Sequence, residues 1–295
     1  MPAFHETKIH GSRDFPYAVY KGILPKLFES FPLHWHDEME IIYVTYGRIN
    51  VFIERSEYVV DRNEIVFVPP QTIHSIKQHN DEYAVYFTFL FRFSLLEGSG
   101  DDICVSKYLE PIYSRRMKMP KYIDSESPLA EKVVPVLDSL IMCSPRFASD
   151  SELLIKAKIF EIMYYIKNNC TVADKDDENT GHLYDLLKES LLYLEDNYAD
   201  HITVSEAAAM SNFSASYFSK LFRELTGSSF TQYLKNYRLE RATEKIREGN
   251  ARISDIAISC GFENLSYFTR AFRVKYGVTP KKYQSASASP KAVRS

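Results

Sequence analysis

An internal repeat near the C-terminus is the feature that most constrains the fold of this chain. Residues 204–213 (VSEAAAMSNF) match residues 253–262 (ISDIAISCGF) at an offset of 49. Residues 217–233 (YFSKLFRELTGSSFTQY) match residues 267–283 (YFTRAFRVKYGVTPKKY) at an offset of 50, so the second copy carries one extra residue at its turn. Self-similarity at this spacing predicts two copies of one small helical unit.

Each copy predicts a short helix, a tight turn and a second helix. Ser205 and Ser254 are candidate N-caps of the first helices. Asn212 and Gly261 occupy the turns, because both residue types tolerate a left-handed backbone. The second helices carry apolar residues at helical spacing, which we expect to face inward: Phe218, Leu221, Phe222 and Leu225 in copy one, and Leu265, Phe268, Ala271 and Phe272 in copy two.

Helix ends and a spacer complete the repeat. Gly227 and Gly277 fit the position that follows a helix C-terminus. Thr279 and Pro280 fit an N-cap and the first turn of another helix. Between the copies, residues 229–248 predict a helix about 30 Å long, close to the roughly 34 Å of one turn of B-DNA. Such a spacer suits two helices that enter successive major grooves.

The charge of the chain is split in a way that favours DNA binding by the repeat. Residues 201–295 hold 15 Lys and Arg against 7 Asp and Glu, a net of +8, whereas the remainder holds 21 against 32, a net of −11. The exposed faces predicted for the second helices combine hydroxyls with basic side chains that can reach base edges and phosphates. They carry Ser216, Ser219, Lys220 and Arg223 in copy one, and Asn264, Ser266, Thr269, Arg270 and Arg273 in copy two.

Residues 183–284 resemble the DNA-binding domain of the AraC/XylS transcription regulators. The stretch GFENLSYFTRAFRVKYGVTPKKY is similar to the pattern characteristic of that family. The resemblance implies seven helices, two of them recognition helices. By matched position it places DNA contacts on Ser216, Ser219, Lys220, Ser266 and Arg270. Ala215 and Ser216 are small where larger contacting residues often stand, which weakens the expectation of base readout by copy one.

The N-terminal half has a different sequence pattern, in which predicted strands precede predicted helices. Residues 40–46, 49–53, 64–68 and 83–93 read as strands of an antiparallel sandwich or barrel, and residues 128–142 and 150–168 as helices. Ile155, Ile159, Ile162 and Ile166 lie on one face of the second helix. Two interpretations are open: this stripe packs against the sheet of the same chain, or it forms the seam of a dimer.

Four polar residues of this half form a candidate site. His34, His36 and Glu40 share parity on a predicted strand, which leaves Trp35 on the opposite side, and His74 follows a Pro-Pro turn. The spacing resembles that of metal-binding cupins. We favour an effector pocket lined by His34, His36, Glu40 and His74, or hydrogen bonds within the barrel; a divalent metal ion at these residues is the less favoured alternative, and no other cofactor is expected.

The sequence thus predicts an α+β chain, with a cupin-like β-barrel and helices followed by an all-α tandem helix-turn-helix domain. Residues 1–172 form the effector-binding and dimerisation domain, 173–181 a linker, 182–284 the DNA-binding domain and 285–295 a disordered tail. The four scattered cysteines are expected to be reduced thiols. The polar start and the lack of a long apolar run predict a soluble, cytoplasmic protein without membrane contact.

The favoured function is a transcription regulator controlled by a small-molecule effector. The resemblance suggests a sugar or related metabolite. Its partners would be double-stranded promoter DNA, the effector, a second copy of the chain in a homodimer and, at the promoter, RNA polymerase. The sequence offers no nucleophile–base pair and no phosphate loop, so we do not expect an enzyme. Two alternatives stay open: a metal-binding cupin enzyme or metal sensor fused to a DNA-binding domain, and an N-terminal domain that serves only for dimerisation.

Overall fold

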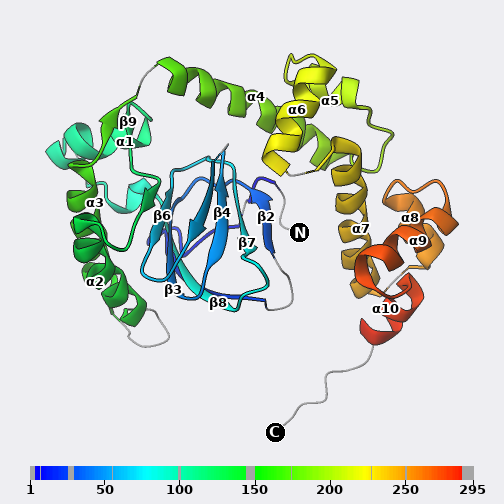
Figure 1. The fold of residues 1–295 in the computed structure, drawn as a ribbon, viewed down its shortest axis with the longest axis horizontal. Coiled ribbons are helices and arrows are strands. Elements are labelled where there is room, and N and C mark those ends of the chain that lie inside the picture. The colour runs from blue at the N-terminus through cyan, green and yellow to red at the C-terminus, as the bar shows by residue number, and fades with distance from the viewer. Residues whose placement is uncertain are drawn as a thin grey trace, which may run out of the picture. The chain divides into compact units, whose positions relative to one another are not determined.

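The computed structural model describes most of the 295 residues in two compact units, and the chain passes from one unit to the other after Tyr184 (Figure 1). The described residues are 4–6, 8–25, 30–54, 56–98, 101–143, 150–173, 175–226, 228–249 and 251–287; side chains are not described for 30–32, 175–182 and 286–287. The N-terminal unit contains the strands, and the C-terminal unit is helical.

Two antiparallel sheets build the N-terminal unit. The first has the order β1-β8-β3-β6-β10 and the second the order β2-β7-β4-β5. The prediction of an α+β chain with a sheet-rich N-terminal domain and a helical C-terminal part is confirmed. Among the described strands the two sheets share no hydrogen-bonded pair, so they do not close into a barrel. A small sheet pairs β9 with β11. The strands are β1 (Tyr17–Leu24), β2 (Ser30–His34), β3 (Met39–Tyr46), β4 (Ile49–Ile53), β5 (Ser56–Val60), β6 (Ile65–Val68), β7 (His74–Gln78), β8 (Ala84–Phe91), β9 (Met117–Lys118), β10 (Tyr122–Ile123) and β11 (Thr171–Val172).

Strand β3 connects the two cores of this unit. Alternate side chains of a strand point to opposite faces. Met39 and Ile41 lie in a core shared with helices, whereas Ile42 and Val44 lie in a core shared with the second sheet. Glu40 has the parity of Ile42 and Val44, so β3 directs this carboxylate toward the space between the sheets.

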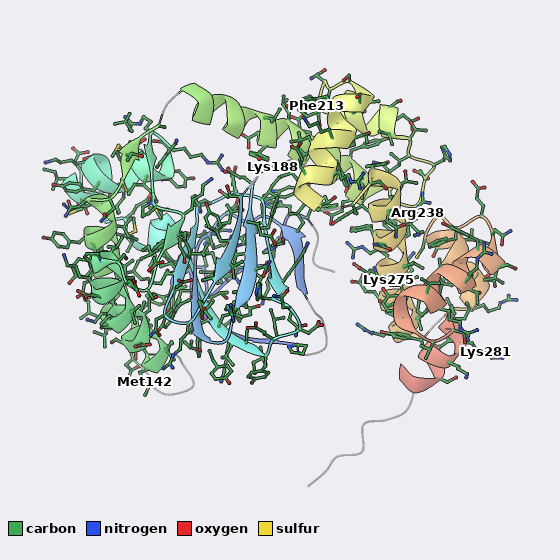
Figure 2. All side chains as sticks on the ribbon, viewed as in Figure 1. Met142, Lys188, Phe213, Arg238, Lys275 and Lys281 are labelled. Atoms are coloured by element: carbon green, nitrogen blue, oxygen red, sulfur yellow. The ribbon has the colours of Figure 1, made fainter. Side chains whose placement is uncertain are left out.

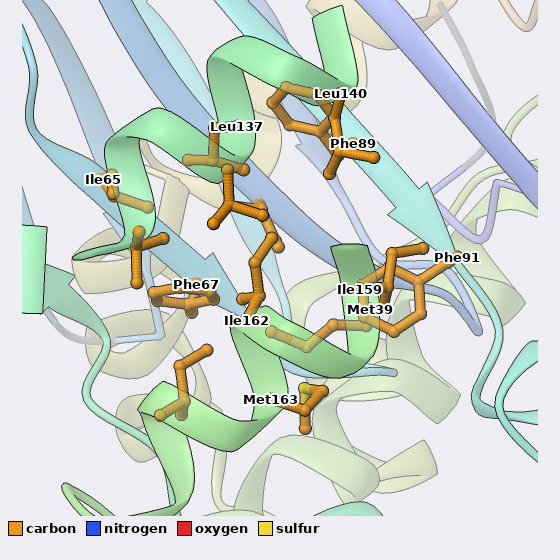
Figure 3. Packing of buried hydrophobic residues seen from close by; sticks show 14 of the residues in the cluster. Met39, Ile65, Phe67, Phe89, Phe91, Leu137, Leu140, Ile159, Ile162 and Met163 are labelled. Atoms are coloured by element: carbon orange, nitrogen blue, oxygen red, sulfur yellow. The ribbon is translucent and has the colours of Figure 1, made fainter. Parts of the chain in front are cut away.

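Helices cover the other face of the five-stranded sheet (Figure 3). Ser127 is the N-cap of α2 (Pro128–Met142), and its hydroxyl accepts a hydrogen bond from Ala130 N at 3.1 Å. Helix α2 packs beside α3 (Glu152–Lys167). Shorter helical segments are Phe93–Leu95, Val105–Leu109 and α1 (Glu110–Tyr113).

The isoleucine stripe of α3 belongs to this intrachain core. Ile155, Ile159, Ile162 and Ile166 are each at most 4% exposed and share one cluster with Phe89 and other strand residues. Figure 3 labels Ile159 and Ile162 within this packing. The interpretation that the stripe forms a dimer seam is therefore wrong, because its side chains are buried inside the chain and cannot contact a second copy.

Seven helices make up the C-terminal part, as the family resemblance implies. They are α4 (Lys175–Asn197), α5 (Val204–Met210), α6 (Ala215–Thr226), α7 (Phe230–Glu248), α8 (Ile253–Ser259), α9 (Leu265–Tyr276) and α10 (Pro280–Ser287). Two predictions made for the ends of this region differ from the structure. α4 runs through most of the predicted linker 173–181, and α10 extends into the predicted disordered tail; residues 288–295 lie outside the described part.

The turns of both repeats have the predicted backbone, but the predicted N-caps are wrong. Asn212 and Gly261 adopt φ values of 55° and 78°. Thr203 caps α5 in a capping box with Glu206, and Arg252 precedes α8 without a side-chain cap. Ser205 and Ser254 therefore lie inside their helices.

A glycine was predicted to follow the second helix of each repeat, and the structure describes this position in the second repeat. Gly277 ends α9 with φ 74°, as predicted, whereas Gly227 lies outside the described residues. Pro280 opens α10, and Thr279 Oγ1 accepts a hydrogen bond from Lys282 N at 3.4 Å.

All four cysteines are free thiols, in line with the prediction; Cys143 and Cys260 are buried, Cys170 is half-buried and Cys104 is exposed. None of the described helices is both long and apolar enough to cross a membrane.

Candidate DNA interface and histidine cluster

Helix α6 presents the predicted polar face of the first repeat. Its apolar residues Phe218, Leu221, Phe222 and Leu225 are buried as expected. Ser216, Ser219, Lys220 and Arg223 are exposed. Ser219 Oγ donates to Ala215 O at 2.7 Å, and Lys220 Nζ lies 3.9 Å from Glu224 Oε1. Arg223 makes no ion pair with any described residue.

Helix α9 lines a groove on the surface of the second repeat. The groove has a volume of about 680 Å³ and is lined by Leu265, Ser266, Thr269, Arg270, Arg273, Val274 and Thr279. Four of the residues predicted for DNA contact thus gather on one surface. Leu265 was expected to face inward but is 47% exposed in the first turn of α9.

Asn264 has a structural role beside its predicted one. It is the N-cap of α9, and its Oδ1 accepts a hydrogen bond from Tyr267 N at 2.9 Å. Tyr217 and Tyr267 occupy matching positions of the repeats and are 42% and 44% exposed, although neither was among the predicted DNA-contact residues. Their identity at the offset of 50 was the available signal. The Arg270 guanidinium lies 6.0 Å from the Tyr267 ring centre.

Other basic residues of the C-terminal unit have partners within that unit, and Figure 2 labels two of them, Arg238 and Lys275. From α7, Arg238 donates to Tyr198 O and Asp200 O, both at 2.7 Å. Arg241 pairs with Glu244, and Lys275 of α9 pairs with Glu240 of α7. These three cations have intrachain partners, whereas Lys220 and Arg223 of α6 and Arg270 and Arg273 of α9 are exposed.

The predicted polar cluster of the N-terminal unit is assembled from several elements. His34 ends β2 and lies opposite His74, the first residue of β7, in the antiparallel register. His36 lies in the connection that follows β2, and Glu40 lies in β3. The residues converge as predicted, but not through shared parity on one strand, because the chain changes sheets between His34 and Glu40.

The cluster is compact and buried. His34, His36, Glu40 and His74 each place a potential ligand atom within 4.8 Å of the others, and none is more than 5% exposed. Glu40 Oε2 lies 3.3 Å from His36 Nε2 and 2.8 Å from His74 Nε2. The His34 and His74 ring centres are 4.1 Å apart.

Residues near the N-terminus cover this cluster. Glu6 N donates to Trp35 O and Trp35 N donates to Phe4 O, at 2.9 and 2.8 Å. Glu6 Oε2 thereby lies 3.8 Å from His34 Nε2, and Glu6 Oε1 lies 3.7 Å from His10 Nε2. Trp35 is buried beneath Phe4 and His5, on which its ring stacks.

Electrostatics couple the members of the cluster. Burial lowers the pKa of His36, but its hydrogen bond to Glu40 and the charges of nearby carboxylates raise that pKa overall. Burial raises the pKa of Glu40, and the interactions with His36 and His74 outweigh it, so the pKa of this carboxyl is well below its usual range. Glu40 is therefore a carboxylate, suited to bind a cationic group.

A polar cavity lies beside the cluster. It has a volume of about 490 Å³ and is lined by Asp37, Pro70, Gln71, Arg92, Phe93, Ser94, Glu97, Tyr113 and Arg115. The four predicted residues are not among its walls. The two sites are connected through the backbone, because Gln71 N donates to His36 O at 2.7 Å.

Comparison with known families identifies both units. Residues 29–194 match the model of the AraC-like ligand binding domain, and residues 207–286 match a helix-turn-helix domain. The first match alone spans more than half of the chain. The chain belongs to the AraC family of transcription regulators.

Relatives along most of the chain agree with this AraC-family assignment. The HTH-type transcriptional regulator YfiF of Bacillus subtilis is 26% identical over 91% of this chain and 83% of its own length. The HTH-type transcriptional activator RhaS of Escherichia coli is 24% identical over 93% of this chain and 96% of its own. A solved DNA-binding transcriptional dual regulator from Escherichia coli K-12 is 33% identical over 35% of this chain and 92% of its own, with a TM-score of 0.33. The two family models and the relatives YfiF and RhaS identify this chain as a DNA-binding transcription regulator with a ligand-binding domain.

Proposed function

We propose that this regulator reads promoter DNA with α9 and α6 in two successive major grooves, under the control of a small polar effector. The groove along α9 carries the proposal, because it gathers Ser266, Thr269, Arg270 and Arg273 on one exposed surface. The 19 residues of α7 make a rod of about 28 Å between the two repeats. That length is close to the spacing of major grooves along one face of B-DNA.

The two recognition helices contact different parts of the DNA. α9 presents two arginines, whose planar guanidinium groups match the acceptors of guanine. α6 presents hydroxyls with Lys220 and Arg223 and suits phosphate contacts that fix the register. Asn264 contributes at the start of α9 through its side-chain amide, since its oxygen caps the helix.

The effector binds in the N-terminal unit. The cavity of about 490 Å³ has the size of a metabolite site. Its walls combine charged and amide groups with Phe93 and Tyr113, a mixture that suits a hydroxyl-rich molecule such as a sugar. His34, His36, Glu40 and His74 form the buried centre beside this cavity, and the Gln71–His36 hydrogen bond transmits occupancy between the two.

The regulator acts as a homodimer at promoters in the cytoplasm, where it contacts RNA polymerase, and it carries out no catalysis. Since the isoleucine stripe is internal, the dimer surface is the opposite face of α3. Leu153, Leu154 and Tyr164 are 85%, 48% and 58% exposed there. Light scattering should show a dimer for the native chain and a monomer for the double variant Leu153→Glu, Tyr164→Glu, with unchanged helicity; a dimer in both would reject this surface.

Mapping of bound DNA across the genome tests the central proposal. The expected result is a small set of sites with a shared motif upstream of genes, and the genes beside them indicate the effector. Fluorescence anisotropy on one such site and on a scrambled duplex then gives the specificity. Equal affinity for both duplexes would overturn the proposal. A metal sensor is the second candidate, and the histidine cluster favours it.

A further inference from the structure

The histidine cluster poses a hydrogen-bonding problem. His74 Nδ1 lies 2.8 Å from Thr72 O, and His36 Nδ1 lies 3.1 Å from Glu38 O. A carbonyl can only accept, so each Nδ1 donates its hydrogen. In the neutral imidazole the other nitrogen, Nε2, then carries a lone pair and no hydrogen.

The Nε2 atoms of both histidines face the same carboxylate oxygen. Glu40 Oε2 lies 2.8 Å from His74 Nε2 and 3.3 Å from His36 Nε2. His74 Nε2 is fully buried and has no hydrogen-bond partner of acceptable geometry despite that short distance. One proton can join His36 Nε2 to Glu40, but it leaves His74 Nε2 against the same carboxylate oxygen in a space closed to water. A shared cation would satisfy all three groups.

We propose that His34, His36, Glu40 and His74 bind one divalent transition-metal ion, and that Glu6 closes the site from the N-terminal segment. The inference deepens the proposed function by naming what the centre of the ligand-binding domain holds. Imidazole and carboxylate ligands without a thiolate suit Zn²⁺, Fe²⁺, Co²⁺, Ni²⁺ or Mn²⁺.

The geometry needs little adjustment to bind such an ion. Bonds of about 2.1 Å at tetrahedral angles separate ligand atoms by about 3.4 Å. The four ligand atoms already lie within 4.8 Å of one another. The backbone carbonyls of Thr72 and Glu38 orient His74 and His36 through their Nδ1 atoms, which is the support that metal-binding histidines usually have.

Glu6 links the ion to the N-terminal segment. Its carboxylate lies 3.8 Å from His34 Nε2, and the pairing of Phe4 and Glu6 with Trp35 holds it there. A second carboxylate at this distance lowers the net charge of the loaded site. Occupancy of the site therefore stabilises the pairing of the segment with Trp35.

Titration of the full-length protein with Co²⁺ after dialysis against EDTA tests the site. We expect one equivalent to bind, with visible absorption bands that one equivalent of Zn²⁺ removes. X-ray absorption should show nitrogen and oxygen ligands around the cobalt. Glu40→Gln keeps the side-chain shape and should weaken binding at least tenfold, whereas His201→Gln, at an exposed histidine of the other unit, should bind like the native chain.

Hydrogen exchange provides a readout that does not depend on ligand variants. Metal should slow exchange of the Glu6 and Trp35 amides in the native protein, and Glu6→Gln should reduce that protection and weaken affinity about tenfold without changing the stoichiometry. Folded native protein that takes up no stoichiometric Co²⁺, or Glu40→Gln that binds as tightly as native, would overturn the proposal. Anisotropy on operator DNA with the same samples separates the two proposals: operator binding without metal uptake overturns only the metal site.

Discussion

Single basic residues of the C-terminal unit fall into two kinds. Arg238, Arg241 and Lys275 have intrachain partners that join helices or helix ends. Arg270 and Arg273 lie exposed in the groove of α9. Sequence position could not distinguish these groups, because all of them are cations on helices of the same basic segment.

Arg270 is the residue for which we predict base readout. Arg270→Ala should cost about 1–3 kcal/mol of binding free energy on the specific site and relax preference at one base pair. Anisotropy on operator and scrambled duplexes measures both. Arg48→Ala, which removes an exposed arginine of the N-terminal unit, is the charge-matched control. Equal losses on the two duplexes would reject base readout, and no loss on either would reject contact.

Lys220 is predicted to serve the phosphate backbone. Within the described residues, its exposed ammonium has a single and distant ion-pair partner, Glu224, at 3.9 Å. Lys220→Ala should weaken binding to specific and random DNA alike and reduce the slope of log K against log salt by about one. Titrations at several salt concentrations give that slope. A loss confined to the operator would show instead that Lys220 reads a base.

Among the described glycines of the C-terminal unit, the one in the turn of the second repeat makes the strictest demand on its sequence. Gly261 has φ 78°, and a Cβ there would lie 2.5 Å from Ala199 O. Gly249 has a similar φ of 76° with open space around it. The two glycines therefore separate the effect of backbone conformation from that of close approach.

Gly261→Ala should destabilise the C-terminal unit more than Gly249→Ala does. Both substitutions pay about 1 kcal/mol for the left-handed backbone, and only the first adds a clash with backbone, which we expect to cost at least about 1 kcal/mol more. Urea unfolding followed by circular dichroism measures the free energies of unfolding. Equal destabilisation by the two variants would show that α8 and α9 can move away from Ala199.

For the whole molecule, the position of α4 decides where the chain can be divided. Leu187, Leu191 and Leu194 are buried. Ser190 Oγ donates to Ala207 O, and Ser211 Oγ donates to Leu186 O, both at 2.6 Å. The second half of α4 is thus part of the C-terminal unit and ties α5 and its turn in place.

A fragment of residues 181–295 should therefore fold and bind operator DNA, whereas residues 198–295 should not fold stably. The shorter fragment loses three buried leucines and both hydroxyl contacts, and removal of a single buried leucine typically costs about 2–5 kcal/mol. Circular dichroism melts and anisotropy compare the two. An unfolded 181–295 fragment, or a cooperative melt for 198–295, would contradict the predicted role of α4.

Much of this molecule was predictable because its signals are local. The repeated apolar spacing predicts α6 and α9, and residues 128–142 coincide with α2, since a helix depends on side chains three and four residues apart. Asn212 and Gly261 indicate the turns through their own backbone preferences. The family assignment followed from the same short stretches.

The tertiary structure decided what each surface meets. Periodicity indicated that Ile155 and Ile159 share a face but not whether that face packs inside the chain, because its partners include strands β3, β6 and β8, which lie more than 60 residues away. Pairing of β2 with β7 brings His74 to His34, and Glu40 joins them from the other sheet. Strand register and sheet pairing are long-range choices made by the whole core, so sequence spacing named the members of this cluster while the fold alone set their geometry.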